Sequence, residues 1–252
     1  MWVEERQSRI LSLLKDKKRV EADKLAQGFN VSRETIRRDL KVLEEKGLLL
    51  RTHGGALINE PSQETPFSVR RVSRVSEKRA LAKSAVTLMS GGGSYFVDAG
   101  STTAAMGEFL SRLGGVSIVT NSIDLALSAR ANNSEADIVL LGGTLASDVP
   151  ATFGEITLRQ LRTFHADIAF VSPVGIDPKV GISYYDLAEA DLAGLMLEQA
   201  RMRVVIADSS KCGVTSRVIV SECDRIDTLI TNHGDTSEYQ RAGIREILHA
   251  AT

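Results

Sequence analysis

The sequence predicts an α/β protein made of two domains, a small helical domain ending in a β-hairpin and a larger domain with a mostly parallel sheet. Three observations predict this. Residues 1–58 have helical periodicity followed by a strand–turn–strand pattern. Residues 59–75 are polar, contain two prolines and indicate a linker. Residues 76–252 alternate short apolar β-rich runs with helical patterns, which is typical of a parallel sheet covered by helices on both faces.

The composition is that of an ordinary globular protein. The chain has 252 residues, of which 43% are apolar and 25% charged, with a net charge of -1. No apolar run reaches the ~18 residues of a membrane span, so no membrane partner is expected. The start lacks the apolar core of a signal peptide, and the two cysteines, Cys212 and Cys223, fit neither a disulfide framework nor a zinc motif. We therefore expect a cytoplasmic protein.

The charge is unevenly distributed along the chain. Residues 1–79 contain 18 Lys and Arg against 12 Asp and Glu, a net of +6, whereas residues 80–252 contain 13 against 20, a net of -7. A basic segment on an acidic body indicates that the N-terminal end contacts a polyanion.

The first domain has the outline of a winged helix-turn-helix. Apolar periodicity predicts helices over about 4–15 and 21–27, and a third helix from the N-cap Ser32 to about residue 46, with Gly47 as its stop. Strand patterns flanking the glycines near residue 54 then predict the hairpin.

The third helix carries the pattern of a recognition helix. Ile36, Leu40 and Leu43 form an inward stripe, which leaves the basic residues on the outer face. Arginine can bridge guanine or grip phosphate, so this face and the hairpin predict DNA contacts. The alternative is a solvated charged helix face, and for His53 an idle exposed side chain. Asp39, beside the inward stripe, is expected to pair with an arginine of this domain. The predicted DNA-binding residues are Ser32, Arg33, Glu34, Thr35, Arg37, Arg38, Lys41, Arg51 and His53.

Six runs in the second domain are predicted strands: Ser94–Asp98, Val116–Thr120, Asp137–Leu141, Ile168–Ser172, Val204–Ala207 and Thr228–Thr231. Small polar residues follow several of them, where open α/β sheets bind ligands. Glycine lets a backbone approach an anion, helix-opening amides and hydroxyls donate to it, and Lys211 supplies a point charge for phosphate. The alternatives are helix capping for each motif, and surface charges at a helix start for Asp186 and Glu189. The predicted ligand-binding residues are Asp98, Gly100, Ser101, Thr102, Thr103, Thr120, Asn121, Ser122, Gly142, Gly143, Asp186, Glu189, Asp208, Ser210 and Lys211.

The whole chain resembles the DeoR-type bacterial transcriptional regulators. Arg6, Ile10, Leu14 and the run SRETIRRDL (32–40) resemble the helix-turn-helix of that family, and RTHGGA (51–56) resembles its wing. The resemblance continues in order through VDAGSTT (97–103), VTNS (119–122), LLGG (140–143), GID (175–177) and ADSSK (207–211).

This resemblance implies a repressor of carbohydrate or polyol catabolism genes, controlled by a phosphorylated sugar or polyol. It also implies an effector domain with the fold of ribose-5-phosphate isomerases and CoA transferases. The segment 184–189 is loosely similar to the glycerol-3-phosphate-responsive branch, whereas Ser172-Pro173-Val174 and Ala193-Gly194 depart from the family pattern. The implied partners are double-stranded operator DNA, the effector and further copies of the chain, as a dimer or tetramer.

Two other classes of protein compete with a regulator, an enzyme and an adaptor. An isomerase lacks support because neither a DGADE-like nor a KGGG-like run is present, and no GxxxxGK[ST] run indicates phosphoryl transfer. The four histidines have no ligand spacing, which disfavours a zinc hydrolase. The other alternative to a regulator with a ligand is an adaptor that senses no ligand. We therefore expect no enzymatic activity, no metal and no cofactor.

Overall fold

The computed structural model describes residues 2–45, 48–52, 54–58, 65–133, 135–146 and 148–250. The chain divides into two compact units, Met1–Ser73 and Arg74–Thr252. The second half of the predicted linker contains a short helix, α4 (Phe67–Val72), and residues 59–64 lie outside the described residues. The division at residues 58 and 76 therefore stays a prediction.

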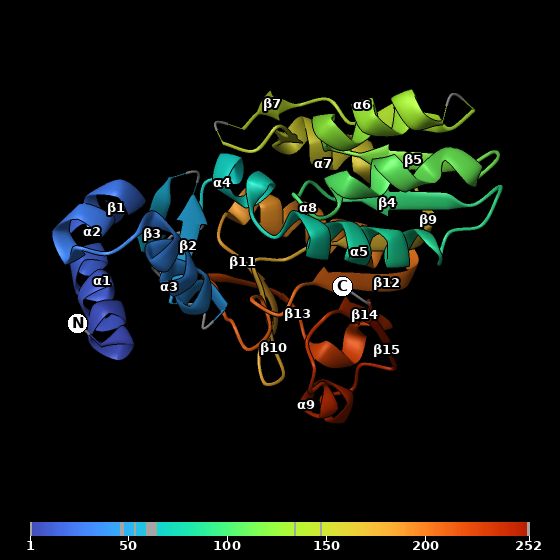
Figure 1. The fold of residues 1–252 in the computed structure, drawn as a ribbon. Helices are drawn as coiled ribbons and strands as arrows, with labels where there is room; N and C mark the ends of the chain where they lie inside the picture. The colour runs from blue at the N-terminus through green and yellow to red at the C-terminus, as the bar shows by residue number, and fades with distance from the viewer. Residues whose placement is uncertain are drawn as a thin grey trace. The chain divides into compact units, whose positions relative to one another are not determined.

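The first unit is the predicted three helices and hairpin. Its elements before α4 are α1 (Val3–Lys17), β1 (Arg19–Glu21), α2 (Ala22–Phe29), α3 (Arg33–Glu45), β2 (Leu49–Thr52) and β3 (Gly55–Ile58). All three helices contribute side chains to one apolar core, including Leu14 of α1, Leu25 of α2 and Ile36 of α3. The strands form a small antiparallel sheet in the order β1-β3-β2 (Figure 1). Strand β1 was not predicted, because three residues are too short for a periodic signal.

The hairpin depends on glycine at two positions. Gly54 has a φ of 95°, a conformation that residues with a Cβ rarely adopt. A Cβ on Gly55 would lie 2.0 Å from the carbonyl oxygen of Val20, because β1 pairs closely with β3 there. His53, the remaining turn position, lies outside the described residues. The GG pair of the wing thus serves both the turn and the strand pairing.

The second unit alternates strands and helices. Its elements are α5 (Val75–Val86), β4 (Ser94–Val97), η1 (Ala104–Arg112), β5 (Ser117–Thr120), α6 (Ile123–Asn132), β6 (Asp137–Leu140), β7 (Thr144–Leu145), β8 (Thr152–Phe153), α7 (Glu155–Leu161), β9 (Ala166–Val171), β10 (Gly175–Asp177), β11 (Gly181–Tyr184), α8 (Leu187–Glu198), β12 (Ala200–Ala207), β13 (Val218–Ser221), η2 (Cys223–Arg225), β14 (Thr228–Thr231), α9 (Ser237–Arg241) and β15 (Glu246–His249).

Within the described residues, seven strands form one sheet in the order β15-β14-β12-β9-β4-β5-β6, and every neighbouring pair is parallel (Figure 1). The six predicted strands all belong to this sheet, which confirms the largely parallel α/β prediction. The seventh, β15, is an edge strand with two exposed ends, so its apolar signal is weak.

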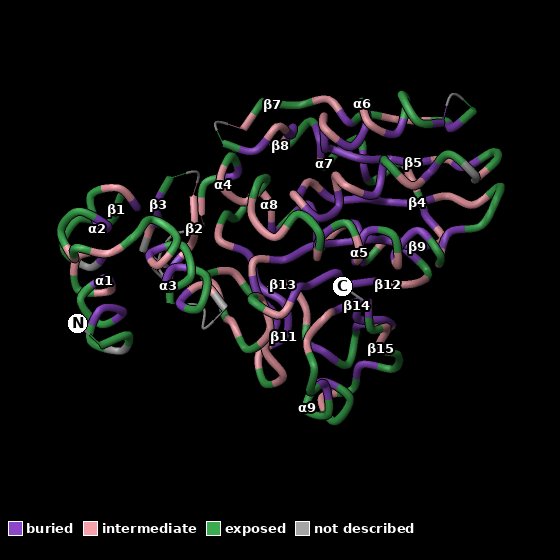
Figure 2. The backbone as a smooth tube through the Cα atoms, viewed as in Figure 1, coloured by how far each residue is buried: buried purple, intermediate pink, exposed green. Residues whose placement is uncertain are grey.

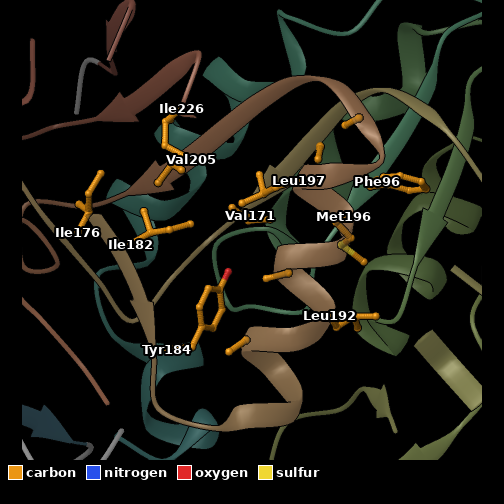
Figure 3. Close-up of a cluster of buried hydrophobic side chains, with 14 of the residues drawn as sticks. Phe96, Val171, Ile176, Ile182, Tyr184, Leu192, Met196, Leu197, Val205 and Ile226 are labelled. Atoms are coloured by element: carbon orange, nitrogen blue, oxygen red, sulfur yellow. The ribbon is translucent and has the colours of Figure 1, made fainter. Parts of the chain in front are cut away.

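Both faces of this sheet are covered. Along β9, Ile168 and Phe170 belong to one apolar cluster, while Ala169 and Val171 belong to the other, as strand alternation requires. Helices α5, η1 and α6 cover the first face, and α7 and α8 cover the second. The central strands are therefore buried on both sides (Figure 2). Figure 3 shows Leu192 and Met196 of α8 in the second cluster.

Two features of the second unit differ from the prediction. The helix expected to open at Gly100 is a 3-10 helix that begins only at Ala104, so residues 101–103 form a turn. A small antiparallel sheet, in the order β10-β11-β13, is absent from the sequence-based prediction. This sheet matters for the site because Tyr184 of β11 projects into the second apolar cluster (Figure 3).

Candidate DNA-binding surface and effector site

Helix α3 presents the predicted basic face. Ile36, Leu40 and Leu43 are buried in the core of the first unit. The outer face is exposed at Arg33, Glu34, Arg37, Arg38 and Lys41. Ser32 caps the helix, since its Oγ accepts a hydrogen bond of 3.1 Å from the amide of Thr35. The sequence pattern thus placed the two faces of this helix correctly.

Asp39 holds α1 against α3. Its carboxylate pairs with the guanidinium of Arg6, with 3.2 Å between Nη2 and Oδ1, and Gln7 donates a second hydrogen bond of 3.3 Å to Oδ1. The hydrogen bond with Asp39 raises the pKa of Arg6. Both partners are buried, so this is the structural ion pair that the sequence predicted.

Several predicted DNA-contact residues also have partners inside the unit. Arg33 forms a bidentate ion pair with Asp23 of α2, and its hydrogen bonds lower the pKa of Asp23. Arg38 lies 3.6 Å from Glu34 on the exposed face of α3. A further ion pair joins β2 to α3, with 3.0 Å between Arg51 Nε and Glu44 Oε2. Arg33 and Arg51 therefore brace the helix-turn-helix and the wing, whether or not they also contact DNA.

The carboxyl ends of the parallel strands meet at one edge of the large sheet, as in all such sheets. Asp98, Asn121, Ser172 and Asp208 follow β4, β5, β9 and β12, which include neighbouring strands of the sheet. All four side chains are buried. The structure therefore brings together polar groups that are far apart in the sequence.

Asp98 is fixed on one side only. Its Oδ2 accepts hydrogen bonds from the Ser172 amide at 3.0 Å and from the Tyr184 hydroxyl at 2.8 Å. Its Oδ1 is buried and has no hydrogen-bond partner among the described residues. Burial raises the pKa of Asp98, and the hydrogen bonds from Ser172 and Tyr184, the charge of Lys211 and the nearby Thr103 hydroxyl only partly offset this effect.

Lys211 reaches across two strand ends. Its Nζ donates to Ser172 Oγ at 2.9 Å and to the Pro173 carbonyl at 2.6 Å. Burial acts to raise the pKa of Asp208, but the charge of Lys211 and the hydroxyl of Ser210 outweigh it, so that the pKa of Asp208 is lowered. The ammonium group of Lys211 is thus held beside the strand ends, where it could form an ion pair with an anionic ligand.

The segment after β4 is a compact turn of small residues. Thr102 and Thr103 are buried, and Thr103 Oγ1 donates a hydrogen bond of 3.2 Å to the Gly100 carbonyl. A Cβ on Gly100 would lie 3.0 Å from Thr103 Oγ1 and 3.5 Å from Ser172 Cβ. Ser101 is half-buried. Glycine at position 100 therefore leaves room for the Thr103 hydroxyl inside this turn.

The segment after β5 is more rigidly hydrogen-bonded. Thr120 Oγ1 donates to the Val97 carbonyl at 2.7 Å, which ties β5 to β4, and Ser122 caps α6. Asn121 Nδ2 donates to the Thr152 carbonyl at 3.2 Å. Among the described residues, Asn121 Oδ1 has no hydrogen-bond partner.

Other predicted effector residues have local structural contacts. The Gly142 amide donates to Gln160 at 2.7 Å, and a Cβ on Gly143 would lie 2.1 Å from Thr157 Oγ1. Asp186 caps α8 through the amides of Ala188 and Glu189, at 2.8 and 3.3 Å. These contacts match the capping alternative, and effector contacts by these residues stay a prediction.

Sequence reasoning missed a polar ring at the start of α5. Arg74 Nη1 lies 3.2 Å from Glu77 and 3.5 Å from Ser209 Oγ; Asn232 donates to Glu77 at 2.8 Å and accepts from the Ser209 amide at 2.7 Å. The sequence predicts a linker through residue 75, whereas Arg74 lies at the start of α5. A helix that precedes a strand of a parallel sheet begins near the carboxyl ends of the strands. The predicted strand at 94–98 therefore already indicated that the start of the preceding helix, with Arg74 and Glu77, lies near the site.

Two absences bear on the site. No group of His, Cys, Asp and Glu suited to a metal occurs in the part of the chain that the structure describes. No helix among the described residues has the length and apolar character needed to cross a membrane.

Comparison with known families decides the classification. Residues 6–62 match the DeoR-like helix-turn-helix domain, and residues 73–233 match the DeoR C terminal sensor domain. The chain belongs to the DeoR family. Its members that resemble it over nearly their whole length are transcriptional regulators, which confirms the predicted DNA-binding regulator and the expectation that it is not an enzyme.

Three relatives illustrate the similarity within the DeoR family. The regulator GolR of Listeria innocua is 29% identical over 97% of this chain and 98% of its own length. The glycerol-3-phosphate regulon repressor of Escherichia coli is 30% identical over 90% of each chain. The repressor GlcR of Bacillus subtilis is 33% identical over 92% of this chain and 89% of its own length.

Solved structures are more distant from this DeoR-family chain. A ribose-5-phosphate isomerase in complex with phospho-erythronic acid has a TM-score of 0.40 at 18% identity, covering 54% of this chain and 52% of the isomerase. The probable sor operon regulator of Shigella flexneri has a TM-score of 0.38 at 16% identity, covering 57% of this chain and 86% of its own. Similarity at this level carries no argument about ligand or reaction.

Proposed function

We propose that this DeoR-family regulator represses genes of carbohydrate or polyol catabolism, and that a phosphorylated sugar or polyol controls its binding to operator DNA. The effector binds at the carboxyl edge of the large sheet. Its phosphate contacts Lys211 and the turn at 101–103, and its hydroxyls contact the polar residues that follow β4 and β5.

The exposed basic face of α3 supports the DNA half of this proposal. Arg37, Arg38 and Lys41 project away from the core on the exposed face of α3, where a recognition helix presents side chains to phosphates and base edges. The pair between Arg38 and Glu34 is exposed and therefore weak, so Arg38 can exchange it for DNA at little cost.

The position of Lys211 is the observation that carries the effector half. Its ammonium group is held by Ser172 and Pro173 in front of the β9 and β12 ends. A phosphate needs donors that are already in place, because ordering them on binding would cost affinity. The backbone and hydroxyl donors at 101–103 supply the remaining contacts expected of a phosphate loop.

The proposal is tested by titrating the full chain on the DNA upstream of its own gene. A thermal-shift screen of sugar and polyol phosphates first selects a ligand, and fluorescence anisotropy then measures the effector concentration that changes DNA binding. Lys211→Ala should raise this concentration roughly 10- to 150-fold, because a charge-assisted hydrogen bond contributes about 1.5–3 kcal/mol.

The matched control is Lys179→Ala, which removes an exposed lysine of the same unit and should leave the response unchanged. An equal response of Lys211→Ala and wild type would exclude Lys211 from the site. DNA binding that no phosphorylated sugar or polyol alters would leave a regulator or adaptor without this effector.

The same function implies a homo-oligomer, a dimer or tetramer, acting in the cytoplasm. Helix-turn-helix domains usually read symmetric half-sites, which a symmetric assembly matches. Light scattering of the full chain, free and on DNA, measures the assembly directly. A single copy per operator would contradict this part of the proposal.

A further inference from the structure

Two buried oxygens at the carboxyl edge have no hydrogen-bond partner among the described residues, Asp98 Oδ1 and Asn121 Oδ1. Asp98 is 4% exposed and Asn121 is 1% exposed. Leaving a buried polar atom unsatisfied is costly, and such atoms in folded proteins call for an explanation. Both oxygens lie where the strands of this sheet end and a ligand is expected.

The two side chains are neighbours on one face of the sheet. Strands β4 and β5 are paired in register up to Val97 and Thr120, and Asp98 and Asn121 directly follow these two strand ends. Neighbouring strands lie about 4.8 Å apart, and side chains two residues apart share a face. Phe96 and Val119, two residues earlier, both belong to the second apolar cluster.

Each oxygen is held in a fixed position by the rest of its side chain. Asp98 Oδ2 is occupied by Ser172 and Tyr184. Asn121 Nδ2 must face the Thr152 carbonyl, since turning the amide over would set two acceptors against each other. The protein therefore presents two oriented, adjacent oxygens rather than two mobile side chains.

We propose that Asp98 and Asn121 together bind two hydroxyls on adjacent carbon atoms of the effector, and that this pair selects against deoxy analogues. The inference rests on the proposed function for the phosphorylated part of the ligand. A hydroxyl can donate to a carboxylate and also accept from a protonated carboxyl, so it suits Asp98 in either state. A second anion would be repelled by the two acceptor oxygens, and a cationic group would be repelled by Lys211 nearby.

The expected selectivity follows from the oxygens that a deoxy analogue leaves unsatisfied. A site built to hydrogen-bond a hydroxyl penalises the analogue that lacks it, because its buried polar group stays unpaired. We expect a deoxy analogue to bind about 5- to 150-fold more weakly than its parent. Asp98→Asn keeps the shape and still accepts from Ser172 and Tyr184, but replaces the free acceptor by a donor.

The test is calorimetric titration of the full chain with matched ligand pairs. The pairs are glycerol 3-phosphate with 2-hydroxypropyl phosphate, ribose 5-phosphate with 2-deoxyribose 5-phosphate, and glucose 6-phosphate with 2-deoxyglucose 6-phosphate. For a pair whose parent binds, wild type should prefer the parent by at least 5-fold. Asp98→Asn and Asn121→Ala should reduce that preference to less than about 3-fold, mainly by weakening the parent.

The control is Asn133→Ala at the end of α6. The buried Asn133 amide donates to the carbonyls of Leu110 and Leu113, and its oxygen accepts from the Glu135 amide. The substitution should lower stability and leave the preference unchanged. Equal binding of parent and deoxy ligands by wild type would overturn the inference, as would an unchanged preference in both variants.

The outcome also separates this inference from the proposed function. If no phosphorylated ligand binds, the proposed effector class is wrong, and the titration is repeated with ribose, 2-deoxyribose, glycerol and 2-propanol. A preference for ribose and glycerol that Asp98→Asn abolishes would then support the hydroxyl pair alone. No binding of these four would overturn it.

Discussion

The two surfaces proposed to contact ligands are built in opposite ways. On α3 the charged side chains are exposed, and their ion pairs lie in water. At the carboxyl edge the polar side chains are buried, and nearly all their hydrogen bonds are made within the protein. A surface of the first kind gains affinity from counterion release on DNA and tolerates many sequences. A site of the second kind is organised before binding and can be selective.

The comparison predicts that the largest single effect in the first unit comes from its buried ion pair and not from the exposed charges. Arg6→Ala leaves Asp39 buried without its cation and should cost about 3 kcal/mol of unfolding free energy. Calorimetry of the full chain should show the first unit melting earlier, with DNA binding lost.

Its control lies on the same helix. Glu5→Ala breaks the exposed pair with Arg9, which is 2.9 Å long, and should change stability by less than about 1 kcal/mol. Similar losses in the two variants would mean that burial of the Arg6–Asp39 pair adds nothing.

The next effect concerns base recognition by α3. Arg38→Ala should weaken operator binding by about 1–3 kcal/mol if Arg38 contacts a base edge, and Arg37→Ala tests its neighbour. Anisotropy titrations with operator and with scrambled DNA separate specific from general loss. Arg9→Ala, a matched charge removal on α1, should leave the affinity within about twofold. Unchanged affinity in both α3 variants, with folding intact, would remove α3 as the recognition helix.

At the carboxyl edge the expected effect depends on pH. The pKa of Asp98 is raised by burial, so its contribution to stability is complete below about pH 3.9 and is lost as the pH rises through the folded-state value. Asp98→Asn cannot ionise and should gain stability relative to wild type as the pH rises above about 4, by up to about 1.4 kcal/mol for each unit of pKa difference.

Asp208 should behave in the opposite way. Its pKa is lowered, so its contribution is present above about pH 3.9 and is lost as the pH falls through the folded-state value. Asp208→Asn should therefore lose stability relative to wild type as the pH rises. Urea unfolding from pH 3 to 8 measures both trends, and parallel pH curves for the two variants would refute this contrast.

The smallest expected effect is on salt dependence. If Lys41 contacts a phosphate, Lys41→Gln should reduce the slope of log affinity against log salt by about 0.9 and weaken all DNA sequences equally. The same substitution at Lys179 gives the baseline. A change in sequence preference, with the slope unaltered, would instead assign Lys41 to base recognition.

The sequence was sufficient where the signal was local. The stripe at Ile36, Leu40 and Leu43, the Ser32 cap and the six apolar strand runs are all patterns within a short segment, and each has the predicted structure. The same local signal predicts the position of Asp98 and Asn121 at strand ends, whereas their contact with a ligand stays a prediction.

What the sequence did not show depends on distant contacts. The Tyr184 hydroxyl that fixes Asp98 comes from 86 positions away, on a four-residue strand. Glu77 and Asn232 are separated by 155 positions. The unpaired state of Asp98 Oδ1 follows only when every neighbour is in place. No pattern in a single segment contains that information.

The strand order of the large sheet also has a consequence for the timing of folding. Strand β4 pairs with β9, so Tyr95 must contact Ile168, which is synthesised much later. The edge strand β15 is synthesised only near the end of the chain. The first unit, in contrast, closes its hairpin by residue 58. Folding slows as contacts become more distant in sequence, and domains fold in order as they leave the ribosome. We therefore expect newly made chains to carry a folded helix-turn-helix before the large sheet is complete.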